Sequence, residues 1–179
     1  STDMQKLISS AEILIFAVPA AFLKDALKMN KIDSESLRGK TIFSAIKGIV
    51  PEDNAIVGEF FHNNYDVSYE DIGVITGPCH AEEVALEKLS YLTIASQNIQ
   101  NAERVAKMLE CRYIKTSVSD YIYGTEYAAV LKNIFAIASG ISHSLGYGDN
   151  FNAVLISNSI QEIARFLNKV HPITRDINS

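Results

Sequence analysis

Three residues in one hydrophobic stretch, Glu126, Lys132 and Asn133, are the first candidates for chemistry in this sequence. Residues 126–142 are otherwise almost entirely apolar or small and contain no proline, so we expect a helix that is apolar all round and therefore buried. A lysine in such dry surroundings is costly unless it is paired, and its pKa is easily lowered, which makes Lys132 a candidate acid/base or anion-holding group. At about 100° per residue, Glu126 and Asn133 share one face of the helix, and Lys132 lies within about 120° of Glu126.

The same pattern has a simpler interpretation. Long lysine side chains often run along apolar surface and keep the ammonium group in water, so Lys132 can extend to the surface from a core helix. The residue pattern alone leaves both interpretations of Lys132 open.

A second group of candidates lies directly after strand-like apolar runs. In parallel sheets covered by helices, ligands bind beyond the carboxyl ends of the strands. The Gly77 turn is expected to lead into a helix whose backbone N–H groups can face an anion, and Lys47 adds a positive charge. Taken singly, Lys47 is equally a solvated loop lysine and Gly77 part of a plain turn. Together they predict a site for a phosphorylated or otherwise anionic ligand, built from Pro19 with Phe22, Lys47-Gly48 and Gly77-Pro78-Cys79.

The elements that must position these residues alternate along the chain, which predicts an α/β fold with a mostly parallel sheet. The continuous apolar run at the first strand indicates burial on both faces. We expect strands at 13–19, 41–46, 72–76, 91–96 and, shorter than these, 112–116. We expect helices at 4–9 after the N-cap residues 1–3, at 20–29, from 51 through 61, after the turn at 77, and at 101–110.

Beyond residue 119 only helical patterns follow, at 126–142 and 153–170. The sequence therefore predicts an α/β part at 1–119 followed by an all-α part at 120–179.

Composition excludes several classes of function. The 179 residues carry a formal net charge of -5 without a basic cluster, so nucleic acid is not an expected partner, and no amphipathic basic helix or spanning segment indicates membrane insertion. The two cysteines form neither a disulfide framework nor, with the histidines, a zinc pattern, so we expect no metal site and a reducing cytoplasm.

Taken together, the motifs resemble the bacterial type of NAD(P)-dependent glycerol-3-phosphate dehydrogenase, and the resemblance covers nearly the whole chain. The most specific feature is the L-K-N helix followed at close to the family's spacing by a G-x-G-D-N turn. The segments that carry the resemblance are IFAVP at 15–19, AIKG at 45–48, GPCHAEEVA at 77–85, LKNIFAIASG at 131–140 and GYGDN at 146–150.

The resemblance implies part of a dinucleotide-binding, Rossmann-like domain at 1–119 and part of a helical substrate and dimerisation domain at 120–179. It implies NAD or NADP as cofactor and dihydroxyacetone phosphate as substrate, reduced to sn-glycerol 3-phosphate for glycerophospholipid synthesis. It also implies a cytoplasmic homodimer. The family's glycine-rich first turn and its later Asp and Arg segments are absent, so we expect an internal fragment that is inactive alone.

The resemblance also assigns roles around the substrate. Lys132 is implied as the catalytic lysine that exchanges a proton with the substrate's C2 oxygen, and Asn133 as its neighbour on the substrate. Lys47, Gly77 and Cys79 are implied as further substrate contacts. The family usually has serine where this chain has Cys79, and a thiol is the weaker hydrogen-bond donor.

Phe22, Lys47 and Ala81 are implied as cofactor contacts. Two other hypotheses remain open at this stage. One is a different two-domain dehydrogenase, of the ketopantoate reductase or 6-phosphogluconate dehydrogenase type, which also places lysines on a helix after the cofactor domain. The other is a non-catalytic interaction module whose helices after Asp120 form a dimer interface.

Overall fold

The computed structural model describes residues 3–172 of the chain. Cα packing divides the chain into two compact units, Ser1–Glu126 and Tyr127–Ser179, which are described separately. The domain assignment with its boundary at 119 stays a prediction. Among residues 3–172, no helix combines the length and the apolar character needed to cross a membrane.

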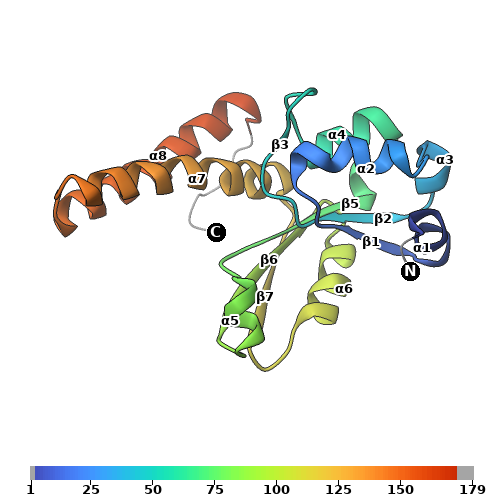
Figure 1. Ribbon diagram of the computed structural model, residues 1–179, viewed down its shortest axis with the longest axis horizontal. Coiled ribbons are helices and arrows are strands. Elements are labelled where there is room, and N and C mark those ends of the chain that lie inside the picture. The colour runs from blue at the N-terminus through green and yellow to red at the C-terminus, as the bar shows by residue number, and fades with distance from the viewer. Residues whose placement is uncertain (1–2, 173–179) are drawn as a thin grey trace. The chain divides into compact units, whose positions relative to one another are not determined.

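The first unit is built on a five-stranded mixed sheet in the order β1-β2-β5-β6-β7 (Figure 1). Strands β1, β2 and β5 are mutually parallel, β6 is antiparallel to β5, and β7 is parallel to β6. The predicted mostly parallel sheet is confirmed, with the direction reversed after β5. The strands are β1 (Ile13–Phe16), β2 (Thr41–Ser44), β5 (Ile72–Thr76), β6 (Ser90–Ser96) and β7 (Ile114–Ser119).

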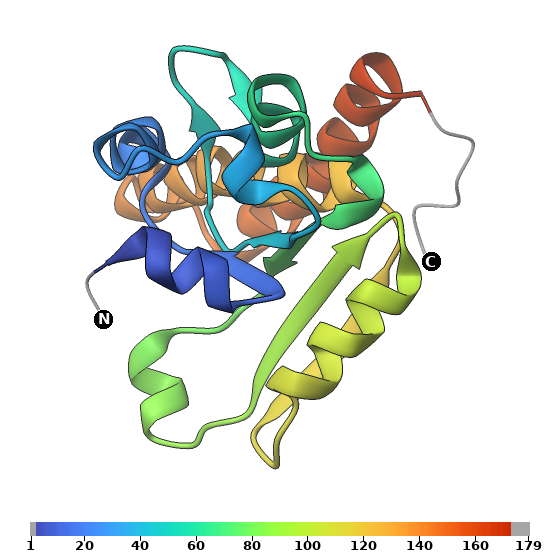
Figure 2. The same cartoon turned by 90° about the vertical axis from the view of Figure 1, so that its right-hand side faces the viewer.

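Helices cover both faces of this sheet because side chains alternate along each strand. Ile42 and Val74 belong to the core cluster on one side of the sheet, whereas Phe43 and Ile75 belong to the cluster under α6 on the other. The ribbon shows α6, in yellow-green, on one side of the sheet (Figure 2). Gly73 makes room for this second layer, since a Cβ there would lie 2.2 Å from the Phe43 ring. The helices of the first face are α1 (Met4–Ser10), η1 (Ala20–Phe22), α2 (Leu23–Met29), α3 (Ser34–Leu37) and α4 (Val57–Tyr65), with α6 (Ile99–Leu109) on the second.

Two further short helical elements of this unit are η2 (Tyr69–Asp71) and α5 (Ala81–Ala85). The predicted N-cap of the first helix is confirmed, because Asp3 Oδ1 accepts a hydrogen bond from the Lys6 N–H at 3.1 Å. The last strand is longer than expected, with six residues in β7.

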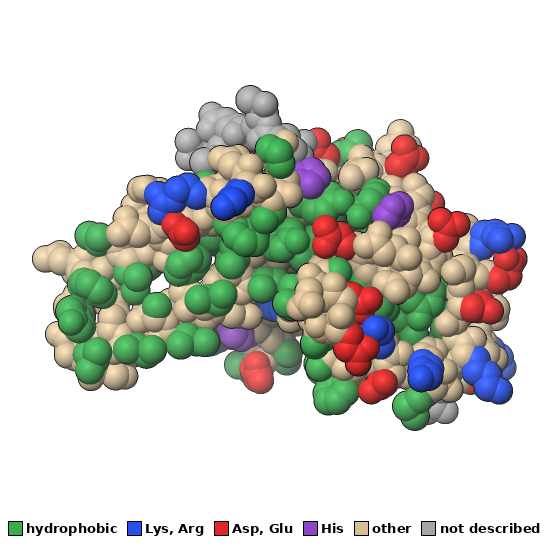
Figure 3. All heavy atoms as spheres, turned by 90° about the horizontal axis from the view of Figure 1, so that it is seen from above, with side chains coloured by type: hydrophobic (Ala, Val, Ile, Leu, Met, Phe, Trp, Pro, Cys, Tyr) green, Lys and Arg blue, Asp and Glu red, His purple; other side chains and the backbone are tan. Residues whose placement is uncertain are grey.

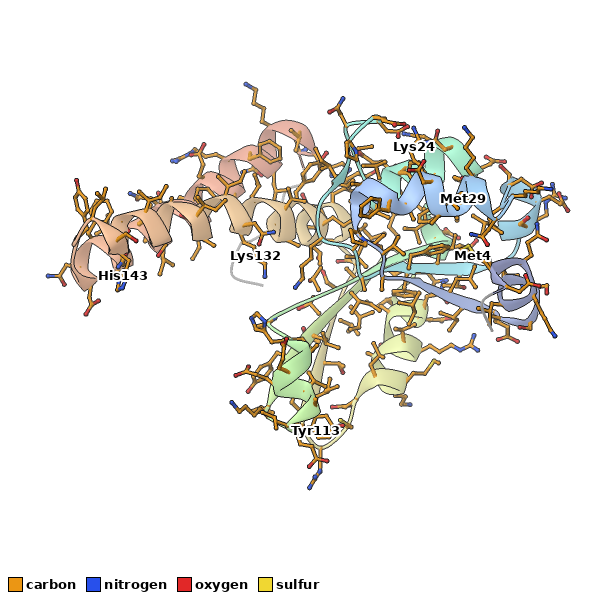
Figure 4. All side chains as sticks on the ribbon, in the orientation of Figure 1. Met4, Lys24, Met29, Tyr113, Lys132 and His143 are labelled. Atoms are coloured by element: carbon orange, nitrogen blue, oxygen red, sulfur yellow. The ribbon has the colours of Figure 1, made fainter. Side chains whose placement is uncertain are left out.

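The helix predicted from residue 51 through 61 is wrong in its first half. Residues 49–56 instead form the hairpin of β3 (Ile49–Val50) and β4 (Ala55–Ile56), and α4 starts at Val57. Asn54 adopts a positive φ of 49° in the turn. Lys24 contacts Glu52 at 2.7 Å and Asp53 at 3.0 Å, so the acidic residues pair with this lysine rather than with a helix dipole (Figure 4).

The prediction that the first strand is buried on both faces is also wrong. Leu14 is buried, but Ile15 on the opposite face is 49% exposed. The physical reason is position, because β1 is an edge strand of the described sheet. Leu14 is buried in the first core cluster, whereas on the opposite face Ile13 is only partly buried against the second cluster.

The second unit consists of most of α7 (Ile122–Ser144) and of α8 (Asp149–Val170). The two helices pack on each other through the rings of Tyr127 and Phe166, whose centroids lie 5.3 Å apart, and through Ser142, whose Oγ lies 2.8 Å from Asn152 Oδ1. Both helices display hydrophobic side chains on the surface (Figure 3).

The prediction that the helix at 126–142 is buried all round is wrong. The side chains of Ile134, Ile137 and Ile141 are 57%, 66% and 57% exposed. Within the second unit only α8 packs against α7 among the described residues, so one helix covers one side and leaves the other open. An apolar sequence pattern makes burial favourable, but burial still requires elements on every side.

Candidate active site

The structure brings three of the predicted loops to one edge of the sheet. Phe16, near the end of β1, pairs in register with Ser44 of β2, and Ser44 pairs with Val74 of β5. The strands are parallel, so their carboxyl ends lie together, and the loops after them leave from the same edge. This edge carries the segments 17–22, 45–48 and 77–80.

The first two loops are in direct contact. Gly48 has a φ of +137°, and a Cβ built there would lie 3.5 Å from the Ala20 Cβ. The turn before Gly48 is fixed by Ser44, whose buried Oγ accepts a hydrogen bond from the Ile46 N–H at 3.2 Å. Lys47 therefore extends from an ordered turn, and its side chain is exposed.

The third loop requires a glycine at its start. Gly77 has a φ of +133°, which side-chain-bearing residues rarely adopt, and a Cβ there would lie 2.2 Å from the carbonyl oxygen of Tyr91. The Tyr91 N–H donates a hydrogen bond to the Pro78 carbonyl at 3.4 Å. The loop is thus held against the start of β6, with Cys79 as a half-buried free thiol.

The predicted helix N-terminus behind the Gly77 turn is not a suitable anion site. Helix α5 begins only at Ala81 and has five residues, and its first turn already carries Glu82 and Glu83. These carboxylates complement the helix dipole and repel a second anion. Of the three loops, only the one at 45–48 contains a lysine or arginine, so Lys47 is the cation that they contribute.

The two implied cofactor contacts beside Lys47 are both accessible. Phe22 closes η1, where its N–H donates to the Pro19 carbonyl at 2.9 Å, and its side chain is 61% exposed. Ala81 is exposed at the start of α5.

Lys132 and Asn133 belong to the second unit and are exposed on α7 (Figure 4). Of the two interpretations left open for Lys132, burial in dry surroundings is therefore wrong for the described residues, and a side chain that extends to the surface agrees with the structure. Residues 3–172 contain no group of three or more His, Cys, Asp or Glu side chains arranged to hold a metal ion.

Glu126 is a buried ionisable residue for which the sequence analysis gave a place on the helix but no function. Its side chain is 4% exposed, and Oε2 accepts a hydrogen bond from the Gly58 N–H at 3.1 Å. Burial raises the pKa of Glu126 to about 8, with Glu59 adding to the rise and the Val57 and Gly58 N–H groups opposing it. The available signal was a carboxylate within an apolar stretch, but its partner lies 68 residues away in sequence.

The fold alone indicates a class of enzyme. A mostly parallel sheet with helices on both faces, loops gathered at the carboxyl ends of β1, β2 and β5, and a following helical segment is typical of dehydrogenases with a Rossmann-like domain.

Comparison with known proteins gives the family. The model described as "NAD-dependent glycerol-3-phosphate dehydrogenase N-terminus" matches residues 1–102, and the corresponding C-terminus model matches residues 121–176. The chain belongs to the NAD-dependent glycerol-3-phosphate dehydrogenase family.

Individual relatives agree with this assignment. The chain is 37% identical to the glycerol-3-phosphate dehydrogenase [NAD(P)+] of Oceanobacillus iheyensis over 92% of this chain and 47% of that protein. It is 35% identical to the enzyme of the same name from Bacillus subtilis, over 97% of this chain and 51% of that protein. The crystal structure of the Coxiella burnetii glycerol-3-phosphate dehydrogenase superposes with a TM-score of 0.81 at 25% identity, covering 94% of this chain and 50% of that one. The chain thus spans about half the length of the curated relatives it matches.

Proposed function

We propose that the complete protein reduces dihydroxyacetone phosphate to sn-glycerol 3-phosphate, with NADH or NADPH as the reductant, for glycerophospholipid synthesis. The observation that carries the proposal is the match of both the N-terminal and the C-terminal family models to successive parts of one chain. The name shared by the relatives, glycerol-3-phosphate dehydrogenase [NAD(P)+], supports the cofactor and the substrate.

The loops after β1 and β2 fit a dinucleotide. Phe22 offers an exposed aromatic face, and Gly48 lets the two loops approach closely, since a Cβ there would lie 3.5 Å from the Ala20 Cβ. In the proposal Phe22, Lys47 and Ala81 hold the cofactor. When bound, NAD(P)H supplies the hydride, and the protein orients the two reactants.

The substrate contacts come from the same edge and from α7. Lys47 is exposed on a fixed turn and can hold an anionic group. Gly77 and Cys79 line the substrate through a loop pinned to β6, and Asn133 supports it beside Lys132. A thiol is a weak donor, so Cys79 contributes mainly by shape.

Lys132 provides the acid. The carbonyl carbon of the substrate accepts a hydride while its oxygen gains negative charge, and the Lys132 ammonium group stabilises that charge and gives up one proton to it. In the reverse direction the neutral amine takes the proton from the C2 hydroxyl.

Organisation and location complete the proposal. Residues 1–119 act as part of the cofactor domain, and residues 120–179 as part of the helical substrate domain of a cytoplasmic homodimer. The 179-residue chain by itself is expected to be inactive.

Substrate profiling tests this function. Protein expressed from the complete reading frame is mixed with NADH or NADPH, and the loss of absorbance of the reduced nicotinamide is followed with dihydroxyacetone phosphate or 2-ketopantoate. Oxidation of 6-phosphogluconate is assayed separately with NAD+ or NADP+, as a gain of the same absorbance. We expect turnover with dihydroxyacetone phosphate alone. Turnover only with one of the other two substrates would assign a different two-domain dehydrogenase, and indifference to both cofactors would favour an interaction module.

A further inference from the structure

Glu126 occupies a place where a carboxyl group is expensive to bury. Its Oε2 atom lies next to the first turn of α4, where the Gly58 N–H has no partner within its own helix. The neighbouring side chains are apolar, since a Cβ on Gly58 would lie 3.5 Å from Ile72 Cγ2 and 3.6 Å from Ile122 Cγ2. A polar group in such surroundings is retained only if its hydrogen bonds are satisfied.

The contact depends on close approach at Gly58. A Cβ at that position would lie 2.9 Å from Glu126 Oε2, so the absence of a side chain lets the carboxyl group reach the helix N-terminus. The bond joins residues 58 and 126, and it fixes how α7 is rotated about its own axis in its first turns. In a regular α-helix each residue is rotated by about 100° from the one before it, so the direction of one side chain determines the directions of those in the following turns.

We propose that Glu126 is a positioning residue for Lys132, because its bond to Gly58 sets the rotation of the helix that carries the lysine. The inference rests on the proposed function, in which Lys132 is the proton donor. Lys132 follows Glu126 by six residues in the same uninterrupted helix. The exposed side chain of Lys132 has no hydrogen bond or ion pair among the described residues. The rotation of α7 about its axis therefore determines the direction in which this side chain points.

The protonation state of Glu126 is compatible with this role. Desolvation raises its pKa to about 8, and the ionisable neighbour that acts on it is Glu59 of α4, whose charge adds to the rise. The residues packed beside it from β5 and α7, Ile72 and Ile122, carry no charge. At neutral pH the group is therefore largely a neutral acid, and an amide in its place can accept the same hydrogen bond.

The test uses protein expressed from the complete reading frame. Glu126→Leu removes the acceptor, and Glu126→Gln keeps it. Gly58→Ala leaves Glu126 intact but pushes the carboxyl group away from its partner. Ile122→Ala is the matched control, because it removes packing at the same contact without removing the hydrogen bond. For each variant we measure kcat with dihydroxyacetone phosphate, the dissociation constants for NADH and NADPH, and the thermal midpoint.

We expect Glu126→Leu to lower kcat about tenfold or more, since small displacements of a reacting group have effects of this size or larger. Gly58→Ala should lower kcat in the same direction, and Glu126→Gln should restore it to within about threefold of wild type. The affinity for the reduced cofactor that the wild type uses should stay unchanged in all variants, and Ile122→Ala should lose thermal stability while keeping its kcat.

The outcomes separate the two claims. A wild-type protein that does not reduce dihydroxyacetone phosphate contradicts the proposed function. An active wild type whose kcat is matched by both Glu126→Leu and Gly58→Ala contradicts the positioning role alone. If Glu126→Leu does not fold, Gly58→Ala decides. If kcat falls in proportion to the loss of thermal stability in every variant, the control Ile122→Ala included, the positioning role is also overturned.

Discussion

Two ionisable residues of α7, Glu126 and Lys132, differ in burial and in hydrogen bonding, although they are only six positions apart. Glu126 is buried, hydrogen-bonded to another helix and shifted in pKa. Lys132 is exposed on the same helix. The contrast shows that an apolar stretch does not by itself determine the surroundings of the polar residues within it.

The difference comes from what packs against each part of the helix. The first turns of α7 lie against α4 and β5, through Gly58 and Ile72, and Ile122 is 1% exposed there. The later turns have α8 along one side, and their isoleucines remain more than half exposed. Substitutions in the first two turns should therefore have the larger effects on stability, and substitution of Lys132 should have the largest effect on kcat.

The largest expected effect on stability is a pH dependence that originates at Glu126. Its pKa rises from an ordinary 4.5 to about 8 on folding, so the folded state binds a proton that the unfolded state has released between these values. The associated stabilisation is present below pH 4.5 and is lost as pH rises to about 8, by about 5 kcal/mol at most. Urea unfolding at intervals from pH 5 to 8 should show this fall, and Glu126→Gln should flatten it. Parallel slopes for the two proteins would show that Glu126 does not titrate as described.

Replacement by alanine should destabilise the protein much more at Glu126 than at Lys132. Glu126→Ala leaves the Gly58 N–H without a partner and opens a cavity, so we expect a loss of about 2 kcal/mol in the free energy of unfolding. Lys132→Ala removes an exposed side chain, and the expected change is within about 0.5 kcal/mol. Equal losses, measured by urea denaturation at the same pH, would abolish the distinction between buried and exposed parts of α7.

A pair of glycines in the same helix gives a smaller, matched comparison. A Cβ on Gly124 would lie 2.3 Å from the Tyr121 ring, whereas nothing lies within 4 Å of a Cβ on Gly140. Gly124→Ala should destabilise the protein by about 1–2 kcal/mol, because the ring must move. Gly140→Ala should stabilise it by about 0.5 kcal/mol, since alanine loses less backbone freedom in a helix. Thermal midpoints that shift in the same direction would contradict the comparison.

Local sequence patterns were sufficient for the part of the site that lies on consecutive strands. The apolar runs ending near Phe16, Ser44 and Thr76 predicted parallel neighbours, and the structure places the loops after them at one edge. Because parallel strands end at the same edge of the sheet, their direction alone is enough to bring the loops after them together, whatever contacts the rest of the chain makes.

The features that sequence missed depend on contacts between distant segments. Pro51 and the acidic residues after it resemble a helix start, yet Lys24 pairs with two of them and a hairpin forms. An apolar run predicts a strand but not the direction in which it pairs, so the antiparallel pairing of β6 with β5 could not be predicted from it. The burial of Glu126 depends on its contact with Gly58, and the exposure of Lys132 depends on which elements cover α7. The local sequence around these two residues contains neither kind of information.

The most direct test of the central claim is the effect of Lys132→Ala on turnover. Protein from the complete reading frame is assayed for oxidation of NADH or NADPH by dihydroxyacetone phosphate, beside the wild type, with thermal midpoints recorded for both. We predict a loss in kcat of about 10²-fold or more at an unchanged midpoint, the usual scale for a general acid. A variant that turns over within a few-fold of an active wild type would contradict the assignment of Lys132 as the proton donor.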